Sequence, residues 1–248
     1  MAAGLDTGAV TQDTTYNDVG YIVVGDVLIQ NWDRRPWGLQ SMTGCLQHSL
    51  NVCLAWVSTV MGQDNFYNYM QRFGFGRPTG IDLAGETPGR LKTPGDPDWY
   101  AVDLGTNAFG QGVAVSPIQM LMAVSAVAND GRMVTPHVLS GMVSDGRQVN
   151  IQLEPSGTPI SLETAHTLSN MLSISLENEA SLALVPGYRI AGKTGTAEIP
   201  VNGFYDSTQT NTSFIGWGPV DDPQFMIYVW LDRPSVSIWA NDTAAPLF

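Results

Sequence analysis

Four consecutive residues, Lys193-Thr194-Gly195-Thr196, have the composition of an anion-binding site. Lysine supplies a compact positive charge, the threonine hydroxyls supply hydrogen-bond donors, and glycine lets a ligand approach the backbone closely. Lysine is rare in this chain, since the only other one is Lys92. The residues around this group predict a strand over 188–193, which would place the anion-binding group along the edge of a sheet.

A second pattern, Ser49-Leu50-Asn51, places a hydroxyl and an amide two residues apart. A serine acyl-transfer site needs such groups to relay a proton and to orient the substrate. Taken alone the pattern is common, and its ordinary interpretation is an interrupted helix with two polar residues bonded to the backbone. The downstream Lys-Thr-Gly-Thr favours the catalytic interpretation, because the two patterns occur together in this order in one class of serine enzymes.

The two patterns resemble signatures of the penicillin-binding proteins, and three more stretches extend the resemblance in the same order: residues 73–86, 110–132 and 213–234. The chain is similar over nearly its full length to the transpeptidase domain of a class B, monofunctional penicillin-binding protein. The resemblance implies an α+β fold, in which helices cover a five-stranded antiparallel sheet beside a mostly helical lobe. It implies one partial domain over 1–248, with the helical lobe and a hairpin in about 1–130 and a helix and the sheet in about 131–248.

The family's reaction cross-links peptidoglycan. A serine attacks the penultimate D-alanine carbonyl of a stem peptide, D-alanine leaves, and an amine of a neighbouring stem peptide takes the acyl group. The resemblance implies that Ser49 relays the proton to the leaving amine and that Asn51 orients the substrate amide. It implies that Lys193 supports Ser49 electrostatically and helps to hold the substrate's terminal carboxylate.

The remaining expected site residues bind substrate. The resemblance implies that Thr194 and Thr196 hydrogen-bond the carboxylate of the stem peptide or of a β-lactam, that the backbone N–H of Thr196 is an oxyanion donor, and that Gly195 leaves room for the substrate. No cofactor is implied. The expected partners are stem peptides, β-lactams and membrane-bound cell-wall synthesis proteins. The expected location is the extracytoplasmic face of the cell membrane, with the anchor outside this chain.

The family's third signature, Ser-x-x-Lys, holds the nucleophile and is absent from these residues. Only Gly89 and Ile190 stand three positions before a lysine. We expect the chain to be truncated before this motif and before the family's closing helix, and a degenerate member of the family is the alternative. In either case the chain as given is not expected to form an acyl-enzyme alone.

Two other functions are consistent with the same motifs. A D,D-carboxypeptidase or β-lactamase-like serine hydrolase would use water where a transpeptidase uses an amine. A non-catalytic β-lactam sensor or cell-wall scaffold would bind without turnover. Nucleic acid is not an expected partner, because the net charge of −12 and the pI of about 4.4 leave no basic surface for phosphates.

The pattern of apolar residues predicts the elements that position the site. A hairpin is expected over 21–32, one or two buried helices over 41–61, a helix over 64–73, capped helices from Ser116 to 128 and from Ser161, short strands and turns over 132–160, and strands over 188–193, 213–217 and 225–231.

The sequence supports only weaker predictions about the roles of the two cysteines and the three histidines. Cys45 and Cys53 would lie about 12 Å apart on one helix, too far for a disulfide, so two buried thiols are expected. His48 could act as a base, but a packing role is the more common one for such a histidine. The three histidines are scattered, and no metal site is expected.

Overall fold

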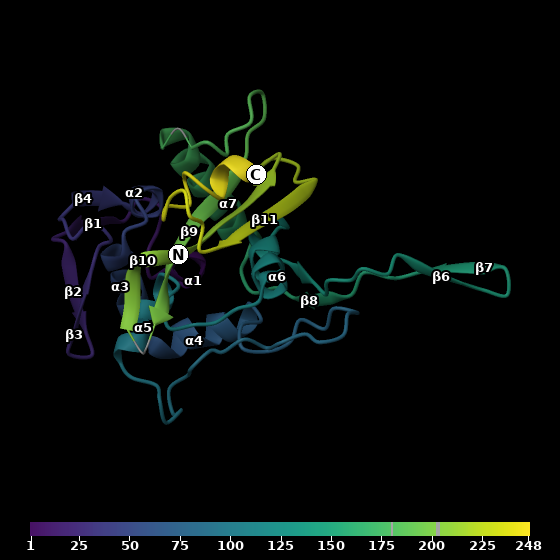
Figure 1. Ribbon diagram of the computed structural model, residues 1–248, viewed down its shortest axis with the longest axis horizontal. Helices are drawn as coiled ribbons and strands as arrows, with labels where there is room; N and C mark the ends of the chain where they lie inside the picture. The colour runs from purple at the N-terminus through teal and green to yellow at the C-terminus, as the bar shows by residue number, and fades with distance from the viewer. Residues whose placement is uncertain (180, 202–203) are drawn as a thin grey trace.

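The computed structural model describes residues 1–179, 181–201 and 204–248. Helices and one antiparallel sheet pack together, and a long hairpin projects from them (Figure 1), so the α+β prediction is confirmed. The helices are α1 (Ala2–Asp6), α2 (Met42–Gln47), α3 (Asn51–Met61), α4 (Gln63–Arg72), α5 (Val102–Ala108), α6 (Pro117–Ala128), α7 (Leu162–Asn178) and the 3₁₀ helix η1 (Ala245–Leu247). None of the helices in these residues is long and apolar enough to cross a membrane.

Three strands form the main sheet, in the order β11-β10-β9. They are β9 (Ala191–Val201), β10 (Phe204–Gly218) and β11 (Phe225–Asp232), and both pairs are antiparallel. The described residues therefore provide three strands of this sheet, where the resemblance implies five. The prediction for its first strand was three residues early, because β9 begins only at Ala191. Within the described residues β9 is an edge of the sheet, as expected.

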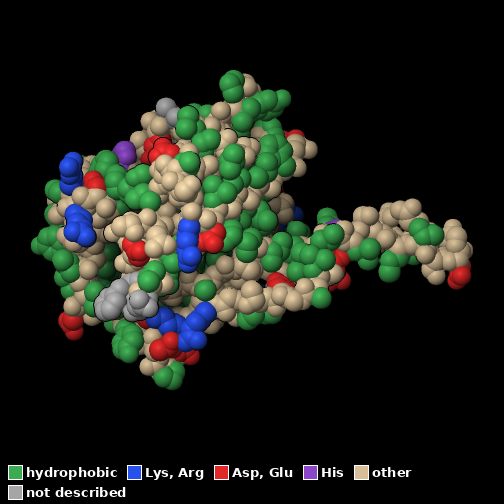
Figure 2. Space-filling view, in the orientation of Figure 1, with side chains coloured by type: hydrophobic (Ala, Val, Ile, Leu, Met, Phe, Trp, Pro, Cys, Tyr) green, Lys and Arg blue, Asp and Glu red, His purple; other side chains and the backbone are tan. Residues whose placement is uncertain are grey.

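The smaller strands pair as short ribbons. They are β1 (Thr15–Asp18) with β4 (Gly38–Ser41), β2 (Tyr21–Val24) with β3 (Val27–Gln30), β5 (Met133–Val134) with β8 (Pro155–Gly157), and β6 (Gly141–Ser144) with β7 (Arg147–Asn150). The β2–β3 ribbon is the predicted hairpin. Figure 1 shows the β6–β7 ribbon extending far from the rest of the molecule, and Figure 2 shows hydrophobic side chains along it.

The predicted helix starts at Ser116 and Ser161 are confirmed, because they depend on local capping. Ser116 accepts from the N–H of Gln119 at 3.3 Å while the Gln119 side chain accepts from the N–H of Ser116 at 2.9 Å, a reciprocal capping box. Ser161 caps α7 in a simpler way, accepting from the N–H of Thr164 at 3.2 Å. Both helices bury apolar faces, and α7 packs on β9.

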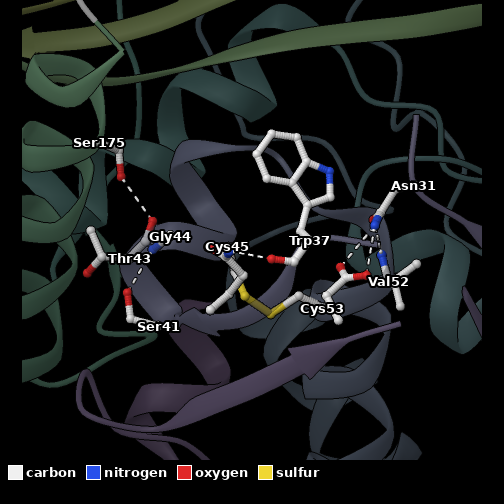
Figure 3. The surroundings of a disulfide bond; sticks show 11 residues. Asn31, Trp37, Ser41, Thr43, Gly44, Cys45, Val52, Cys53 and Ser175 are labelled. Carbon is white, nitrogen blue, oxygen red and sulfur yellow. Dashed lines mark hydrogen bonds between the residues drawn. A yellow bond between two sulfur atoms is a disulfide. The ribbon is translucent and has the colours of Figure 1, made fainter. Parts of the chain in front are cut away.

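The prediction of two free thiols was wrong, because Cys45 and Cys53 form a disulfide with their Cα atoms 6.0 Å apart (Figure 3). The prediction assumed one continuous helix. The chain instead breaks between α2 and α3, and Ser49 takes a left-handed φ of 50° in the break. The change of direction brings the two Cα atoms into the range that a disulfide requires.

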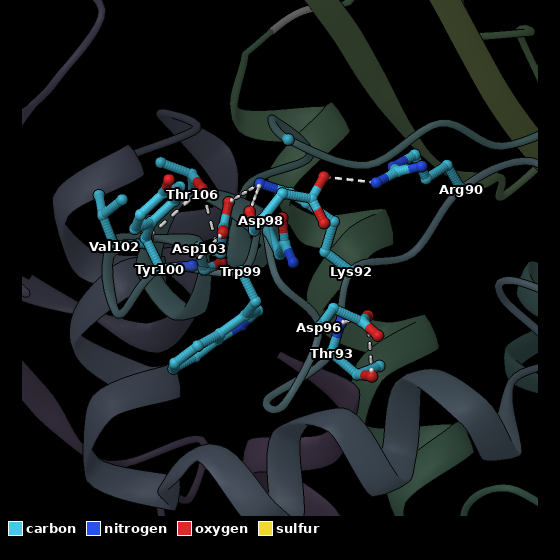
Figure 4. Close-up of polar contacts among 12 residues, drawn as sticks. Arg90, Lys92, Thr93, Asp96, Asp98, Trp99, Tyr100, Val102, Asp103 and Thr106 are labelled. Atoms are coloured by element: carbon cyan, nitrogen blue, oxygen red, sulfur yellow. Dashed lines mark hydrogen bonds and ion pairs between the residues drawn. The ribbon is translucent and has the colours of Figure 1, made fainter.

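The loop before α5 is anchored by a mostly buried ion pair (Figure 4). Lys92 Nζ lies 2.7 Å from Asp103 Oδ1, and the two side chains are 19% and 7% exposed. The other carboxylate oxygen of Asp103 accepts from the N–H of Tyr100 at 2.8 Å. The pair therefore joins the loop to the start of α5, and α5 in turn packs on α3.

Replacing Lys92 with methionine is expected to lower the free energy of unfolding by about 3–5 kcal/mol, because it leaves the Asp103 carboxylate buried without its cation. The nearby pair Arg90–Asp98 is the matched control, since its side chains are 66% and 50% exposed. Arg90→Met is expected to change the stability by at most about 1 kcal/mol. Urea unfolding of both variants measures the difference, and equal shifts would contradict the expectation.

Candidate active site

The two sequence patterns meet at one contact. The Lys193 ammonium donates a hydrogen bond to the hydroxyl of Ser49, although the two residues are 144 positions apart in the chain. The same ammonium lies 3.1 Å from Oγ1 of Thr194. A cation on a hydroxyl stabilises the partial negative charge that the oxygen acquires when it gives up a proton. This contact is therefore suited to proton transfer through Ser49.

Ser49 lies at the tip of the turn between α2 and α3. The turn is closed by hydrogen bonds from the N–H of Ser49 to the carbonyl of Leu46 at 3.2 Å and from the N–H of Leu50 to the carbonyl of Cys45 at 3.0 Å. The left-handed backbone lifts the Ser49 side chain out of the helical path. Asn51 follows as the first residue of α3, where its amide donates to the carbonyl of Gln30 at 3.5 Å.

Two buried polar residues hold the start of α3 in place. Oδ1 of Asn31 accepts from the N–H of Val52 at 3.2 Å, and the Asn31 amide donates to both carboxylate oxygens of Asp18 at 3.0 and 2.9 Å. Asp18 and Asn31 are almost completely buried. Asn31 satisfies an N-terminal N–H of α3, which has no partner within the helix, and Asp18 holds the Asn31 side chain. Together they fix the position of the Ser49–Asn51 segment. Neither residue was predicted from the sequence.

Lys193 is positioned by the pairing of β9 with β10. It lies opposite Ile215, and the preceding residue, Gly192, lies opposite Gly216. A Cβ at Gly192 would come within 2.7 Å of the carbonyl oxygen of Ile215, which is closer than real contacts allow. Glycine next to the lysine thus permits the close approach of the two strands.

The other predicted residues of β9 lie along the same strand. Thr196 Oγ1 accepts from the N–H of Ala240 at 3.2 Å, which leaves the Thr196 hydroxyl proton available to a ligand. Gly195 lies opposite Ser213, and a Cβ there would come within 2.5 Å of the Ser213 hydroxyl. Thr194 through Thr196 are half-buried or exposed, so a ligand could reach them.

Burial and one carboxylate set the charge of Lys193. Burial lowers the pKa of Lys193 to about 8, and the negative charge of Glu179 acts in the opposite direction and raises it. Glu179 follows the last residue of α7, and burial raises its own pKa while the nearby Lys193 lowers it. Near neutral pH Lys193 is therefore mainly an ammonium, but it loses its proton at a lower pH than an ordinary lysine. Glu179 was not predicted from the sequence.

Aromatic side chains surround the turn. The rings of Trp32 and Trp239 meet edge to face at 5.2 Å, and the Trp32 indole donates to the carbonyl of His48 at 3.2 Å. The His48 ring stacks on Trp37 at 4.3 Å, and burial lowers the pKa of His48. These contacts support the packing interpretation of His48. Trp239 and Ala240 are neighbours, so the segment that contacts Thr196 also contacts the Ser49 side of the site.

Comparison of this chain with known proteins agrees with the geometry of the site. A sequence model of the penicillin binding protein transpeptidase domain matches residues 1–248. The chain belongs to this family. The resemblance noted in the sequence is thereby confirmed.

Relatives of this transpeptidase domain include longer proteins. Stage V sporulation protein D of Bacillus subtilis is 35% identical over 257 residues, covering 100% of this chain and 39% of the relative. PbpB of Mycolicibacterium smegmatis is 31% identical, covering 100% of this chain and 40% of the relative. The crystal structure of penicillin binding protein 3 from Mycobacterium tuberculosis, complexed with aztreonam, has a TM-score of 0.89 and 29% identity, covering 100% of this chain and 58% of that one. The chain spans about two fifths of the length of these curated relatives.

Within this transpeptidase domain, the structure brings some of the six predicted site residues together and leaves others apart. Ser49, Lys193 and Thr194 are in direct contact. Gly195 and Thr196 continue the strand, whereas the Asn51 amide contacts the carbonyl of Gln30. The catalytic and binding roles of all six remain predictions.

Proposed function

We propose that these residues form one side of the active site of a penicillin-binding peptidoglycan D,D-transpeptidase. The observation that carries the proposal is the hydrogen bond from the Lys193 ammonium to the Ser49 hydroxyl. It joins the two family signatures at a place where a cation, hydroxyls and an accessible strand occur together. Acyl transfer needs this combination, since a proton must reach the leaving amine while an anionic substrate group is held in place.

We infer the role of each residue from the family resemblance together with the Lys193–Ser49 contact. When the serine nucleophile attacks the D-alanine carbonyl, the C–N bond breaks and the departing amine needs a proton. The Ser49 hydroxyl gives its proton to the amine and regains one from the attacking serine, and the Lys193 ammonium stabilises the oxygen during the exchange. Thr194 and Thr196 hydrogen-bond the substrate carboxylate, the backbone N–H of Thr196 donates to the oxyanion, and Asn51 orients the substrate amide.

The location and partners of the whole protein are also part of the proposal. The buried disulfide Cys45–Cys53 supports an oxidising environment, since reducing compartments keep most thiols free. An oxidising environment agrees with an extracytoplasmic domain that acts on stem peptides and is acylated by β-lactams. Its expected partners are membrane-bound cell-wall synthesis proteins.

Labelling with a fluorescent penicillin tests the function. The full-length natural protein is expected to become covalently labelled in a form that survives denaturation. It should also join two stem peptides with release of one D-alanine per link. Release of D-alanine without cross-linking would instead show a hydrolase, and binding without turnover would show a sensor. Because the 248 residues contain no Ser-x-x-Lys, this segment alone is expected to remain unlabelled.

The pH dependence of acylation tests the charge on Lys193. Above about pH 8 the ammonium is lost, so the acylation rate is expected to fall on the alkaline side. Glu179 raises the pKa of Lys193, so Glu179→Gln should lower that pKa and move the alkaline fall to lower pH. Glu177→Gln is the control, because Glu177 is exposed on the same helix end. If the acylation rate of Glu179→Gln falls at the same alkaline pH as that of the parent, the effect of Glu179 on the pKa of Lys193 is contradicted.

A further inference from the structure

The disulfide encloses the turn that carries Ser49. Cys45 lies in α2 and Cys53 lies in the first turn of α3, and the two are eight positions apart. Neither cysteine has any exposed surface. The ring that they close therefore contains Ser49 and Asn51, the two polar residues of the Ser49-Leu50-Asn51 pattern.

The turn needs an external restraint. Ser49 has a φ of 50°, a conformation that costs a residue with a Cβ about 1–2 kcal/mol. Two short-range hydrogen bonds of the turn, those to the carbonyls of Cys45 and Leu46, oppose this cost locally. Strained residues of this kind persist where the surrounding structure fixes them.

Each end of the ring is anchored to a different part of the fold. On the α2 side, the Ser175 hydroxyl donates to the carbonyl of Thr43 at 3.4 Å and the Asn178 amide donates to the Gln47 side chain at 3.2 Å. Both donors belong to α7, which also packs on β9, the strand that carries Lys193. On the α3 side, Asn31 accepts from the N–H of Val52. The disulfide joins these two anchored helices across the turn that holds Ser49.

We propose that the Cys45–Cys53 disulfide is a positioning element for acyl transfer, because it holds the Ser49 hydroxyl against the Lys193 ammonium. The inference rests on the proposed function. Without the bridge, α2 and α3 can separate slightly while each stays packed, and a displacement of about 1 Å is enough to slow a positioned reaction by about 10²-fold. The loss should therefore appear in the reaction itself and not only in the stability of the fold.

A double-mutant cycle in the full-length protein tests the proposal. The acylation rate with fluorescent penicillin is measured below the melting temperature for the parent, Ser49→Ala, Cys45→Ala/Cys53→Ala and the triple variant. Ser49→Ala is expected to cost about 10²-fold in the parent. In the disulfide-free background it should cost less than about 10-fold, because the hydroxyl is no longer in place to act. An equal cost in both backgrounds would overturn the proposal, since a bridge that only stabilises the fold leaves the ratio unchanged.

Three further measurements distinguish a loss of Ser49 positioning from a loss of fold stability. Met133→Ala removes a buried side chain in another cluster of the core and should lower stability while keeping the full cost of Ser49→Ala. If the double alanine variant does not fold, Cys45→Ala/Cys53→Val takes its place, since valine refills part of the lost volume. In denaturant the parent's cysteines should resist alkylation until a reductant is added, and immediate alkylation would overturn the inference. A parent that is never labelled would instead contradict the proposed function.

Discussion

Replacing Lys193 with alanine is expected to slow acylation of the full-length protein by about 10³-fold or more. The change removes the cation that donates to the Ser49 hydroxyl and that lies 3.1 Å from Thr194 Oγ1. In the proposed mechanism two effects are then lost together, namely the stabilisation of the oxygen that relays the proton and the attraction for the substrate carboxylate. The rate of covalent labelling by fluorescent penicillin, measured at several penicillin concentrations, separates the loss of binding from the loss of chemistry.

Two comparisons define what the lysine contributes. Lys193→Arg keeps the positive charge but replaces the compact ammonium with a planar guanidinium. Compared with Lys193→Ala, it should therefore restore penicillin binding more fully than the acylation rate. Arg189→Ala removes a nearby cation whose partner, Asp221, is exposed, and it should leave the rate nearly unchanged. Full activity of Lys193→Ala would remove this residue from the mechanism.

Removing the Ser49 hydroxyl is expected to have the second largest effect, about 10²-fold in the acylation rate. Two substitutions remove it in different ways, because Ser49 has a left-handed φ of 50°. Ser49→Ala keeps the strained backbone, whereas Ser49→Gly relieves it and should give a protein about 1 kcal/mol more stable. Both variants should be equally slow if the hydroxyl carries the effect.

Thermal unfolding and labelling kinetics, measured on the same two variants, check this prediction. A glycine variant that recovers the parent's rate would show that the backbone of the turn, and not the hydroxyl, supports acylation. A rate that falls only in the glycine variant would point instead to loss of rigidity in the turn.

Features that depend on neighbours in the sequence could be predicted. The capping box at Ser116 and the hairpin turn at Gly25-Asp26 use residues that lie within a few positions of one another, so their chemistry is visible in the chain. The motif Lys193-Thr194-Gly195-Thr196 was visible for the same reason, although β9 begins three residues later than predicted.

Features that depend on packing could not be predicted. The disulfide was missed because Cys45 and Cys53 approach only where the helix breaks, and nothing in the apolar pattern marks a left-handed residue at Ser49. Asp18 and Asn31 act on the start of α3 through the N–H of Val52, which lies 21 positions after Asn31 in the chain. Glu179 influences Lys193 only because α7 packs on β9. Such contacts exist only in the folded molecule.

The separation of 144 residues between Ser49 and Lys193 also has a consequence for folding. Contacts between distant parts of a chain form slowly. The intervening chain must first lose the conformational entropy of loop closure, and only then does the contact stabilise the folded state. The turn at Ser49 and the β9–β10 ribbon can each form from nearby residues, but the hydrogen bond between them cannot. The candidate site should therefore be among the last features to appear during folding. Recovery of penicillin labelling after dilution from denaturant should accordingly lag behind the return of helical structure.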